Sequence, residues 1–367
     1  MLLAASDLPD LSAGAVFLAT GGGGDPYVAR LVAEKALETH GRAEIIDPDD
    51  LDDDAYVVTI GGVGAPTASL ELLPSLGDAG RTLAAFQDHV GRKVDAVVSF
   101  EIGGGNSLIP IVAAVECGIP VVNGDGMGRA LPEAQMMTYP ISGVSPTPAV
   151  AVDYEGNVVT FSTDSIFSYE RQIRSLALAM GGMITACEHP MSGKQLKASI
   201  VPRTLTFSMT IGRILREHRG NAHAIYAPLR DAFAESIYGD LEHLYTGKVV
   251  DSERKIVGGF DVGEATIESF DGATPPLTIG IKNEFLVARV GDEVVASVPD
   301  LISVLDFETS TPINAERLRY GQRVTVYGVG CPDYYRTERA LAVVAPRCFG
   351  FDFDYVPLEE RDALMPL

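Results

Sequence analysis

Carboxylate side chains follow apolar runs in the N-terminal half of the chain. Glu101 follows the run VDAVVSF, Asp125 follows IPVVNG, and Glu133 lies on the turn beyond it. Carboxylates placed in this way could transfer protons to and from a bound substrate or hold a divalent cation. Asp and Asn also stabilise turns without any further role, so this alternative stands for Asp125 and Asn123. We predict Glu101, Asp125 and Glu133 as catalytic residues.

Two glycine-rich segments, TGGGGD and IGGGNS, accompany these carboxylates. Glycine allows close approach to a ligand, and exposed backbone N–H groups at a helix start can bind an anion. The first segment lacks the lysine of a phosphate-binding P-loop and the GxGxxG register, which disfavours a nucleotide-dependent ligase or kinase. A tight turn is the structural alternative. The predicted substrate-binding residues are Gly22, Gly23, Gly24, Asp25, Gly104, Gly105, Asn106, Asn123 and Arg129.

Cys187 and His189 flank Glu188 and offer a thiolate and an imidazole. These groups are typical zinc ligands or members of a nucleophilic set. The two side chains share a side in a strand but diverge on a helix, so their use as ligands depends on the local structure. A purely structural role is the alternative. We predict Cys187 and His189 as the metal-ligand candidates.

The elements that would position these residues have the pattern of an α/β fold. Short apolar runs at residues 15–20, 55–60, 94–100 and 119–123 alternate with helical periodicity and are bounded by glycine. This pattern predicts a mostly parallel sheet with flanking helices over roughly residues 11–150. Ligands of such sheets bind at the carboxyl ends of the strands. We therefore expect the glycine loops, Glu101 and Asp125 to line one pocket.

The pattern changes in the C-terminal half. A turn at residues 155–157 predicts a hairpin, residues 169–245 have helical spacing, and residues 255–346 contain short strands at close intervals. The last region is typical of an antiparallel sheet, sandwich or barrel. We predict an N-terminal α/β domain over residues 1–165 that carries the glycine-loop site. Residues 166–367 would form a C-terminal domain, a helical segment followed by an antiparallel β module.

Composition narrows the classes of partner. The 28 Lys and Arg against 50 Asp and Glu give a formal charge of -22, which repels nucleic acid and anionic membranes. No run approaches the roughly 18 apolar residues of a membrane span. The N-terminus lacks the pattern of a secretory signal, and the four cysteines form no CxxC pair, so we expect reduced thiols and a cytoplasmic location. The expected partners are a small-molecule substrate and further copies of the chain in a homo-oligomer.

Four motifs carry a family resemblance that extends over nearly the whole chain. ATGGGGDPY, EIGGGNS, GIPVVNGDGMGRALPEAQM and APRCFGFDFDYVPL resemble the S-methyl thiohydantoin desulfurase family. The resemblance implies hydrolysis of hydantoin-like rings, with zinc as the suspected cofactor. Family members also resemble proteins encoded near hydantoinase and oxoprolinase genes. Asn123 stands where the family pattern has aspartate, which removes a carboxylate from any metal site there.

Two functions follow from these observations. The first is a metal-assisted hydrolase of hydantoin-like or S-methyl thiohydantoin-like cyclic amide or thioimidate rings. The alternative is a non-catalytic accessory or small-ligand-binding subunit that partners a hydantoinase or oxoprolinase. Metal analysis of the purified protein would distinguish them, because near-stoichiometric zinc supports the enzyme.

Overall fold

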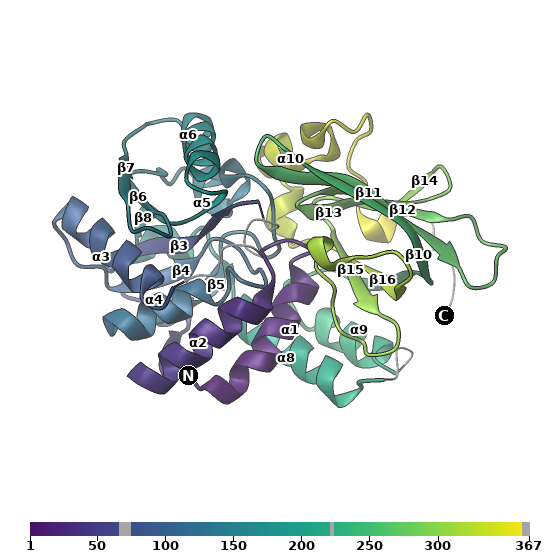
Figure 1. The fold of residues 1–367 in the computed structure, drawn as a ribbon, viewed down its shortest axis with the longest axis horizontal. Helices are drawn as coiled ribbons and strands as arrows, with labels where there is room; N and C mark the ends of the chain where they lie inside the picture. Colours follow the sequence, from purple (N-terminus) through teal and green to yellow (C-terminus); the bar gives the residue numbers. More distant parts are fainter. Residues whose placement is uncertain (66–74, 221–223, 362–367) are drawn as a thin grey trace.

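The computed structural model describes residues 1–65, 75–220 and 224–361, and places two β-sheets side by side with helices around the first (Figure 1). The first sheet, with α3 and α4, lies on the left of Figure 1, and the second sheet lies on the right. Helices α1, α2 and α8 lie below them. The predicted α/β fold class with a β-rich C-terminal part is confirmed.

The first sheet is mixed, with a parallel centre. Its strand order is β1-β2-β5-β4-β3-β8-β6-β7, and β9 pairs with β5. Strands β2, β5, β4 and β3 are mutually parallel, whereas all other pairings are antiparallel. The strands are β1 (Leu2–Leu3), β2 (Ala43–Ile46), β3 (Tyr56–Gly64), β4 (Ala96–Ser99), β5 (Val121–Asp125), β6 (Ala149–Val152), β7 (Val158–Phe161), β8 (Met183–Ser192) and β9 (Val201–Pro202).

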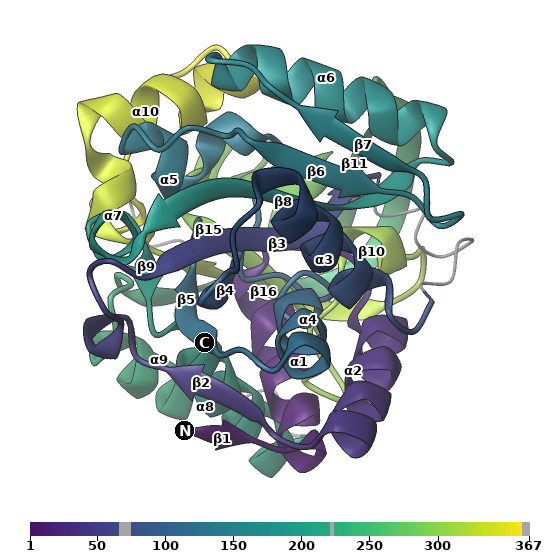
Figure 2. The same cartoon turned by 90° about the vertical axis from the view of Figure 1, so that its left-hand side faces the viewer.

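Helices surround this sheet. Helix α4 packs on β4 and β3, α3 on β8 and β6, and α8 on β5, as Figure 2 illustrates from the side of the first sheet. The helices are α1 (Leu8–Leu18), α2 (Pro26–His40), α3 (Asp78–Val90), α4 (Ile109–Cys117), α5 (Thr138–Ile141), α6 (Ile166–Ala179), α7 (Gly193–Lys197), α8 (Thr204–Glu217), α9 (Tyr226–Ala234) and α10 (Glu338–Val344). None of the described helices is long and apolar enough to cross a membrane.

The predicted first strand at residues 15–20 is wrong, because this run ends helix α1. Its buried residues include Leu8, Leu11, Ala15 and Leu18, which recur at helical spacing on one face. Pro9 lies in the first turn, where its missing N–H has no helical partner to lose. The apolar run was too short for its periodicity to separate strand from helix. The first glycine segment therefore connects two helices, α1 and α2.

Helices α1 and α8 cross at two glycines. A Cβ atom added to Gly14 would lie 1.8 Å from the carbonyl oxygen of Ser208, and one added to Gly212 would lie 1.8 Å from that of Asp10. Both obstacles are backbone atoms, so the helices would have to separate to accept a side chain. The absence of side chains at these two positions therefore permits the contact.

We expect Gly14→Ala to lower the free energy of unfolding by about 1–3 kcal/mol, because overpacking forces the backbones apart. The urea unfolding midpoint measures this change. Gly80→Ala in α3 is the matched control, since the atoms nearest to its new Cβ all belong to the side chain of Glu116 and none to the backbone. An equal loss in the two variants would contradict the role of the helix crossing.

The region between residues 169 and 245 is less helical than predicted. The β6–β7 hairpin around residues 155–157 is confirmed, and α6, α8 and α9 are helical. Residues 183–192 form strand β8 instead, which pairs antiparallel with β3 and β6 in the first sheet. Six of its ten residues are buried, since it lies between two strands. This chain segment thus returns to the N-terminal sheet.

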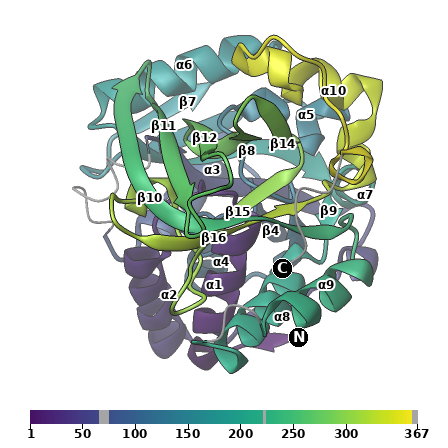
Figure 3. The same cartoon turned by 90° about the vertical axis from the view of Figure 1, so that its right-hand side faces the viewer.

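The second sheet is antiparallel throughout and curls around its own core (Figure 3). Its strand order is β14-β13-β12-β11-β10-β16-β15. The strands are β10 (Leu241–Val257), β11 (Phe260–Ser269), β12 (Leu277–Lys282), β13 (Glu284–Val290), β14 (Glu293–Ser297), β15 (Leu301–Asp306) and β16 (Arg323–Val329). The predicted antiparallel β module is confirmed.

Candidate functional site

A cavity of about 380 Å³ lies where the carboxyl ends of β3 and β4 meet the hairpin between β12 and β13. Its wall includes Gly62 and Glu101 from the first sheet and Glu284 from the second. Helices α2, α3, α4 and α6 also contribute residues to the wall. The cavity is thus lined by both halves of the chain.

The two glycine segments lie against each other at this cavity. The carbonyl oxygen of Gly23 accepts hydrogen bonds from the backbone N–H groups of Gly105 at 2.8 Å and Asn106 at 3.1 Å. A Cβ atom on Gly23 would lie 2.3 Å from the Cα atom of Gly103, and the φ angle of Gly23 is +71°. Both the close approach and the left-handed backbone require glycine here. The predicted meeting of these segments is therefore present, although the first follows a helix.

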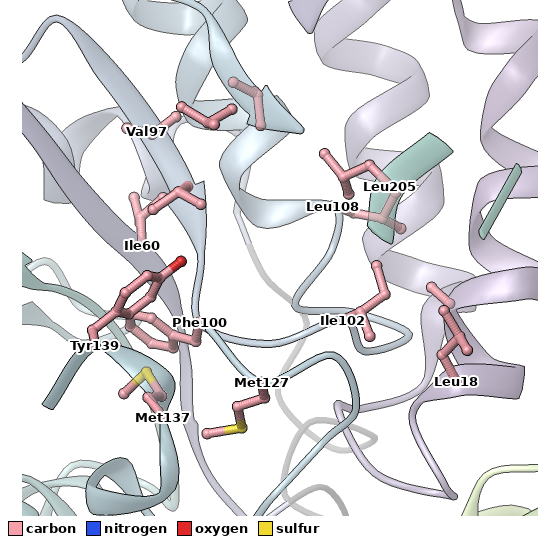
Figure 4. Packing of buried hydrophobic residues seen from close by; sticks show 14 of the residues in the cluster. Leu18, Ile60, Val97, Phe100, Ile102, Leu108, Met127, Met137, Tyr139 and Leu205 are labelled. Carbon is pink, nitrogen blue, oxygen red and sulfur yellow. The ribbon is translucent and has the colours of Figure 1, made fainter. Parts of the chain in front are cut away.

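Apolar side chains pack against the ends of the strands near the cavity. Figure 4 shows Phe100 beside Tyr139, with Met127 and Met137 close to them. A Cβ atom on Gly61 would lie 2.4 Å from the Phe100 ring, so the ring packs directly on strand β3. Phe100 immediately precedes Glu101, and this packing fixes the backbone from which the carboxylate projects.

Glu101 is the best-positioned carboxyl group of the cavity. Its Oε1 accepts a hydrogen bond from Asn106 Nδ2 at 2.7 Å, and its Oε2 accepts one from the Leu131 backbone N–H at 3.2 Å. Asn106 in turn accepts from the Gly62 N–H at 2.8 Å, which joins the loop to β3. Burial raises the pKa of Glu101 to about 7, while the two hydrogen bonds oppose the rise.

Glu284 is a second buried acid on the wall, and the sequence reasoning missed it. It begins β13 directly after Asn283, whose φ of +59° forms the tight turn from β12. The residue is 2% exposed. Burial raises the pKa of Glu284 well above its ordinary value, and the negative charge of Glu101 adds to the rise. Its only sequence signal is a carboxylate at the start of an apolar strand, 183 positions after Glu101.

Glu133 lines the cavity as predicted, but its carboxylate is engaged. Lys282 Nζ and Gln135 Nε2 both donate hydrogen bonds to it. Burial raises the pKa of Glu133, but these two partners outweigh burial and leave the pKa below its ordinary value. Glu133 thus remains ionised near neutral pH and fits a charge-pairing role better than proton transfer.

Five of the predicted catalytic and substrate-binding residues, all within the described ranges, lie off the cavity wall: Gly22, Gly104, Asn123, Asp125 and Arg129. Asp125 accepts hydrogen bonds from the N–H groups of Met127 at 2.6 Å and Gly128 at 2.7 Å. Asn123 accepts from the Thr206 N–H at 3.2 Å near the start of α8. The Asp125 arrangement corresponds to the turn-stabilising alternative, whereas Asn123 lies in strand β5 and contacts the first turn of α8 instead. Gly23, Gly24, Asp25, Gly105 and Asn106 do line the cavity.

Arg129 connects the two halves of the chain. Its guanidinium donates hydrogen bonds to Thr20 Oγ1 at 2.7 Å, to the Asp300 carbonyl at 2.7 Å and to the Pro299 carbonyl at 3.0 Å. A longer bond of 3.4 Å reaches the carbonyl of Phe285, next to Glu284. Arg129 is fully buried, and its hydrogen bonds hold the second sheet against the first glycine segment.

Cys187 and His189 do not fit a zinc centre. Both lie in β8 and are fully buried, and neither is on the cavity wall. Burial raises the pKa of the Cys187 thiol well above its ordinary value, whereas zinc binds the thiolate. His189 has a φ of +51° at a β-bulge, which breaks the side-to-side alternation of the strand. Across the described ranges, no three His, Cys, Asp or Glu side chains gather to hold a metal ion.

Comparisons with known proteins agree with the two-part architecture. The model for the N-terminal domain of S-Me-THD-like proteins matches residues 6–163, and the model for the C-terminal domain matches residues 163–358. A crystal structure of a protein from Chromobacterium violaceum, determined by a structural genomics consortium, is similar with a TM-score of 0.81 and 25% sequence identity. The similarity covers 98% of this chain and 100% of that chain. No curated protein matches the sequence.

Proposed function

We propose that this chain, which belongs to the S-Me-THD-like family, is a hydrolase that replaces the sulfur substituent of an S-methyl thiohydantoin-like ring with oxygen from water. One observation carries the proposal beyond the family: Glu101, on the wall of a cavity of about 380 Å³, has a pKa raised to about 7. A carboxyl group with this pKa can both accept and release a proton near neutral pH.

In the proposed reaction, the oxygen of water forms a bond to the ring carbon that carries the S-methyl group. The Glu101 carboxylate accepts one proton of this water. The carbon–sulfur bond then breaks, and the sulfur takes the proton back from Glu101 and leaves as methanethiol. The second water proton passes to the ring nitrogen as the ring carbon becomes a carbonyl. Water and the thioimidate are thereby converted to the ring amide and a thiol, with no oxidant or reductant required.

Asn106 and Glu284 assist in different ways. Asn106 is a positioning residue, since its amide donates to Glu101 Oε1 and accepts from the Gly62 N–H. Burial and the charge of Glu101 raise the pKa of Glu284 well above its ordinary value, which favours the protonated form of this carboxyl group. A protonated carboxyl group is a hydrogen-bond donor, and it would stabilise negative charge that develops on a ring nitrogen or oxygen.

The zinc suggested by the resemblance has no part in these steps, because Cys187 and His189 lack the arrangement of a zinc site. The donors that the proposal uses are carboxyl and amide groups of the cavity wall. Zinc binding stays a prediction that metal analysis of the purified protein tests separately.

The proposal predicts that the purified chain releases methanethiol from an S-methyl thiohydantoin in water enriched in ¹⁸O. A thiol-reactive dye measures the release, and mass spectrometry measures the label in the ring product. We expect one thiol per ring and one ¹⁸O atom per product molecule. Tight binding without turnover, with or without added zinc, would contradict the hydrolase and favour the accessory subunit.

A further inference from the structure

Acidic side chains outnumber basic ones on the cavity wall. The described part of the wall carries eight Asp and Glu residues and two Arg residues, and it has no Lys or His. If Glu101 and Glu284 hold protons, six carboxylates remain on the wall. Lys282 pairs with Glu133 and Arg81 pairs with Asp78 from outside the wall, which leaves four carboxylates against the two arginines. The charge of the wall therefore opposes an anionic ligand.

Arg174 is the buried cation of the wall, and each of its guanidinium nitrogens already has a partner. Nε donates to Glu170 Oε1 at 2.9 Å, Nη2 to the Pro132 carbonyl at 2.7 Å and Nη1 to the Gly64 carbonyl at 3.4 Å. The group also lies 4.5 Å from the centre of the Phe260 ring. A ligand carboxylate that bound the remaining N–H groups would share this one cation with the buried carboxylate of Glu170 and would be repelled by it.

Arg317 is the other cation, and it lies at the rim. Its Nε donates to Asp25 Oδ2, and its side chain is 53% exposed. Asp25 is also held by the Tyr27 N–H at 2.8 Å, since it caps helix α2. A half-exposed ion pair in contact with water gives little affinity for a further anion.

Part of the wall is apolar. Val28 and Val32 project from α2, Ala79 from α3, and Ile109 and Val112 from α4. The free energy decreases when an apolar part of a ligand replaces water against these side chains. They offer no partner for a charged group, which would lose its hydration there without compensation.

We propose that the cavity takes a ring whose substituent is uncharged and apolar, and that it discriminates against the same ring with a carboxylate substituent. The ring itself rests on the proposed function. The choice of substituent rests on the charges and apolar residues of the wall. The carboxyl groups of Glu101 and Glu284 would then face the ring, and helices α2, α3 and α4 would contact the substituent.

Calorimetric binding to three hydantoins that differ only at ring position 5 tests this inference. We expect the benzyl compound to bind at least about tenfold more tightly than the carboxyethyl compound, a difference of roughly 1.4 kcal/mol. The aminobutyl compound should also bind less tightly than the benzyl compound. Equal or tighter binding of either charged compound would overturn the proposal.

A charge placed on the apolar wall provides a second measurement. We expect Val28→Lys to shift the benzyl-to-carboxyethyl ratio by about tenfold toward the carboxyethyl compound. Leu31→Lys is the matched control, because Leu31 lies on the same helix but is 44% exposed and off the wall. An unchanged ratio in Val28→Lys, or an equal shift in both variants, would show that this wall does not select the substituent.

Binding and turnover fail separately in these experiments. A chain that prefers the benzyl compound but releases no methanethiol contradicts the hydrolase and supports the substituent preference. A chain that turns over substrate but prefers the carboxyethyl compound contradicts only the preference. If none of the three compounds binds, both proposals are overturned.

Discussion

Glu101→Gln should lower kcat for methanethiol release by about 10²–10⁴-fold, the usual contribution of a general acid–base group. The substitution keeps an acceptor for Asn106 but removes the group that takes and returns the proton. Because the pKa of Glu101 is about 7, wild-type kcat/KM should fall as the pH decreases below 7, where the carboxylate becomes protonated. This acid limb should be absent from the residual activity of the variant.

Glu284→Gln is the comparison for this result. Its amide keeps a hydrogen-bond donor where the carboxyl group of Glu284 holds its proton, so we expect a smaller loss of kcat than for Glu101→Gln. Unfolding curves of both variants control for misfolding. A larger loss in Glu284→Gln, with both variants folded, would exchange the two roles.

The pH dependence of stability checks Glu101 without a substrate. The unfolded carboxyl group has an ordinary pKa of 4.5, whereas the pKa in the fold is about 7. The fold therefore prefers the protonated form, and wild-type stability should decrease as the pH rises from about 4.5 to 7. At roughly 1.4 kcal/mol per pKa unit, the full change is on the order of 3 kcal/mol.

Glu101→Gln cannot ionise and should not show this loss. Its free energy of unfolding relative to wild type should therefore increase between pH 5 and pH 8, which urea titrations at the two values measure. Parallel behaviour of the two proteins over this interval would contradict the raised pKa.

Arg129→Met should produce the largest loss of stability, about 3–5 kcal/mol, as expected when one partner of a buried ionic network is removed. Methionine approximates the volume of the side chain but donates no hydrogen bonds. The carbonyl groups of Pro299 and Asp300 and the hydroxyl of Thr20 would lose their donor inside the protein. Glu284 would also lose the cation that partly offsets its raised pKa.

Urea unfolding measures this loss, and Arg213→Met provides its control. Arg213 is an exposed residue of α8, and its Nη2 lies 3.5 Å from Thr210 Oγ1. We expect its replacement to change the free energy of unfolding by no more than about 0.5 kcal/mol. Similar effects of the two substitutions would mean that Arg129 does not hold the two sheets together.

Several elements could be predicted because their signals are local. Strands β3, β4 and β5 are short Val-rich runs with turn residues after them, and such runs fit only the buried centre of a sheet. The β6–β7 hairpin and the second sheet follow from turn residues and close strand spacing. The errors were segments whose state depends on packing: α1, which lies against α8 through Gly14, and β8, which returns to the first sheet.

The apolar pattern correctly placed Glu101 after a buried strand, but it predicted a strand before the first glycine segment, where the structure has helix α1. The sequence did not show that Glu101 lies on the cavity wall and Asp125 does not, because both follow apolar runs in the same way. The two carboxyl groups differ in their hydrogen-bond donors, which are the Asn106 side chain for Glu101 and the Met127 backbone N–H for Asp125. Glu284 reaches the cavity through a hairpin of the second sheet and the buried Arg129, neither of whose positions has a local sequence signal. A pKa and a cavity wall depend on burial by distant segments, whereas strands, turns and helix caps depend on neighbours in the chain.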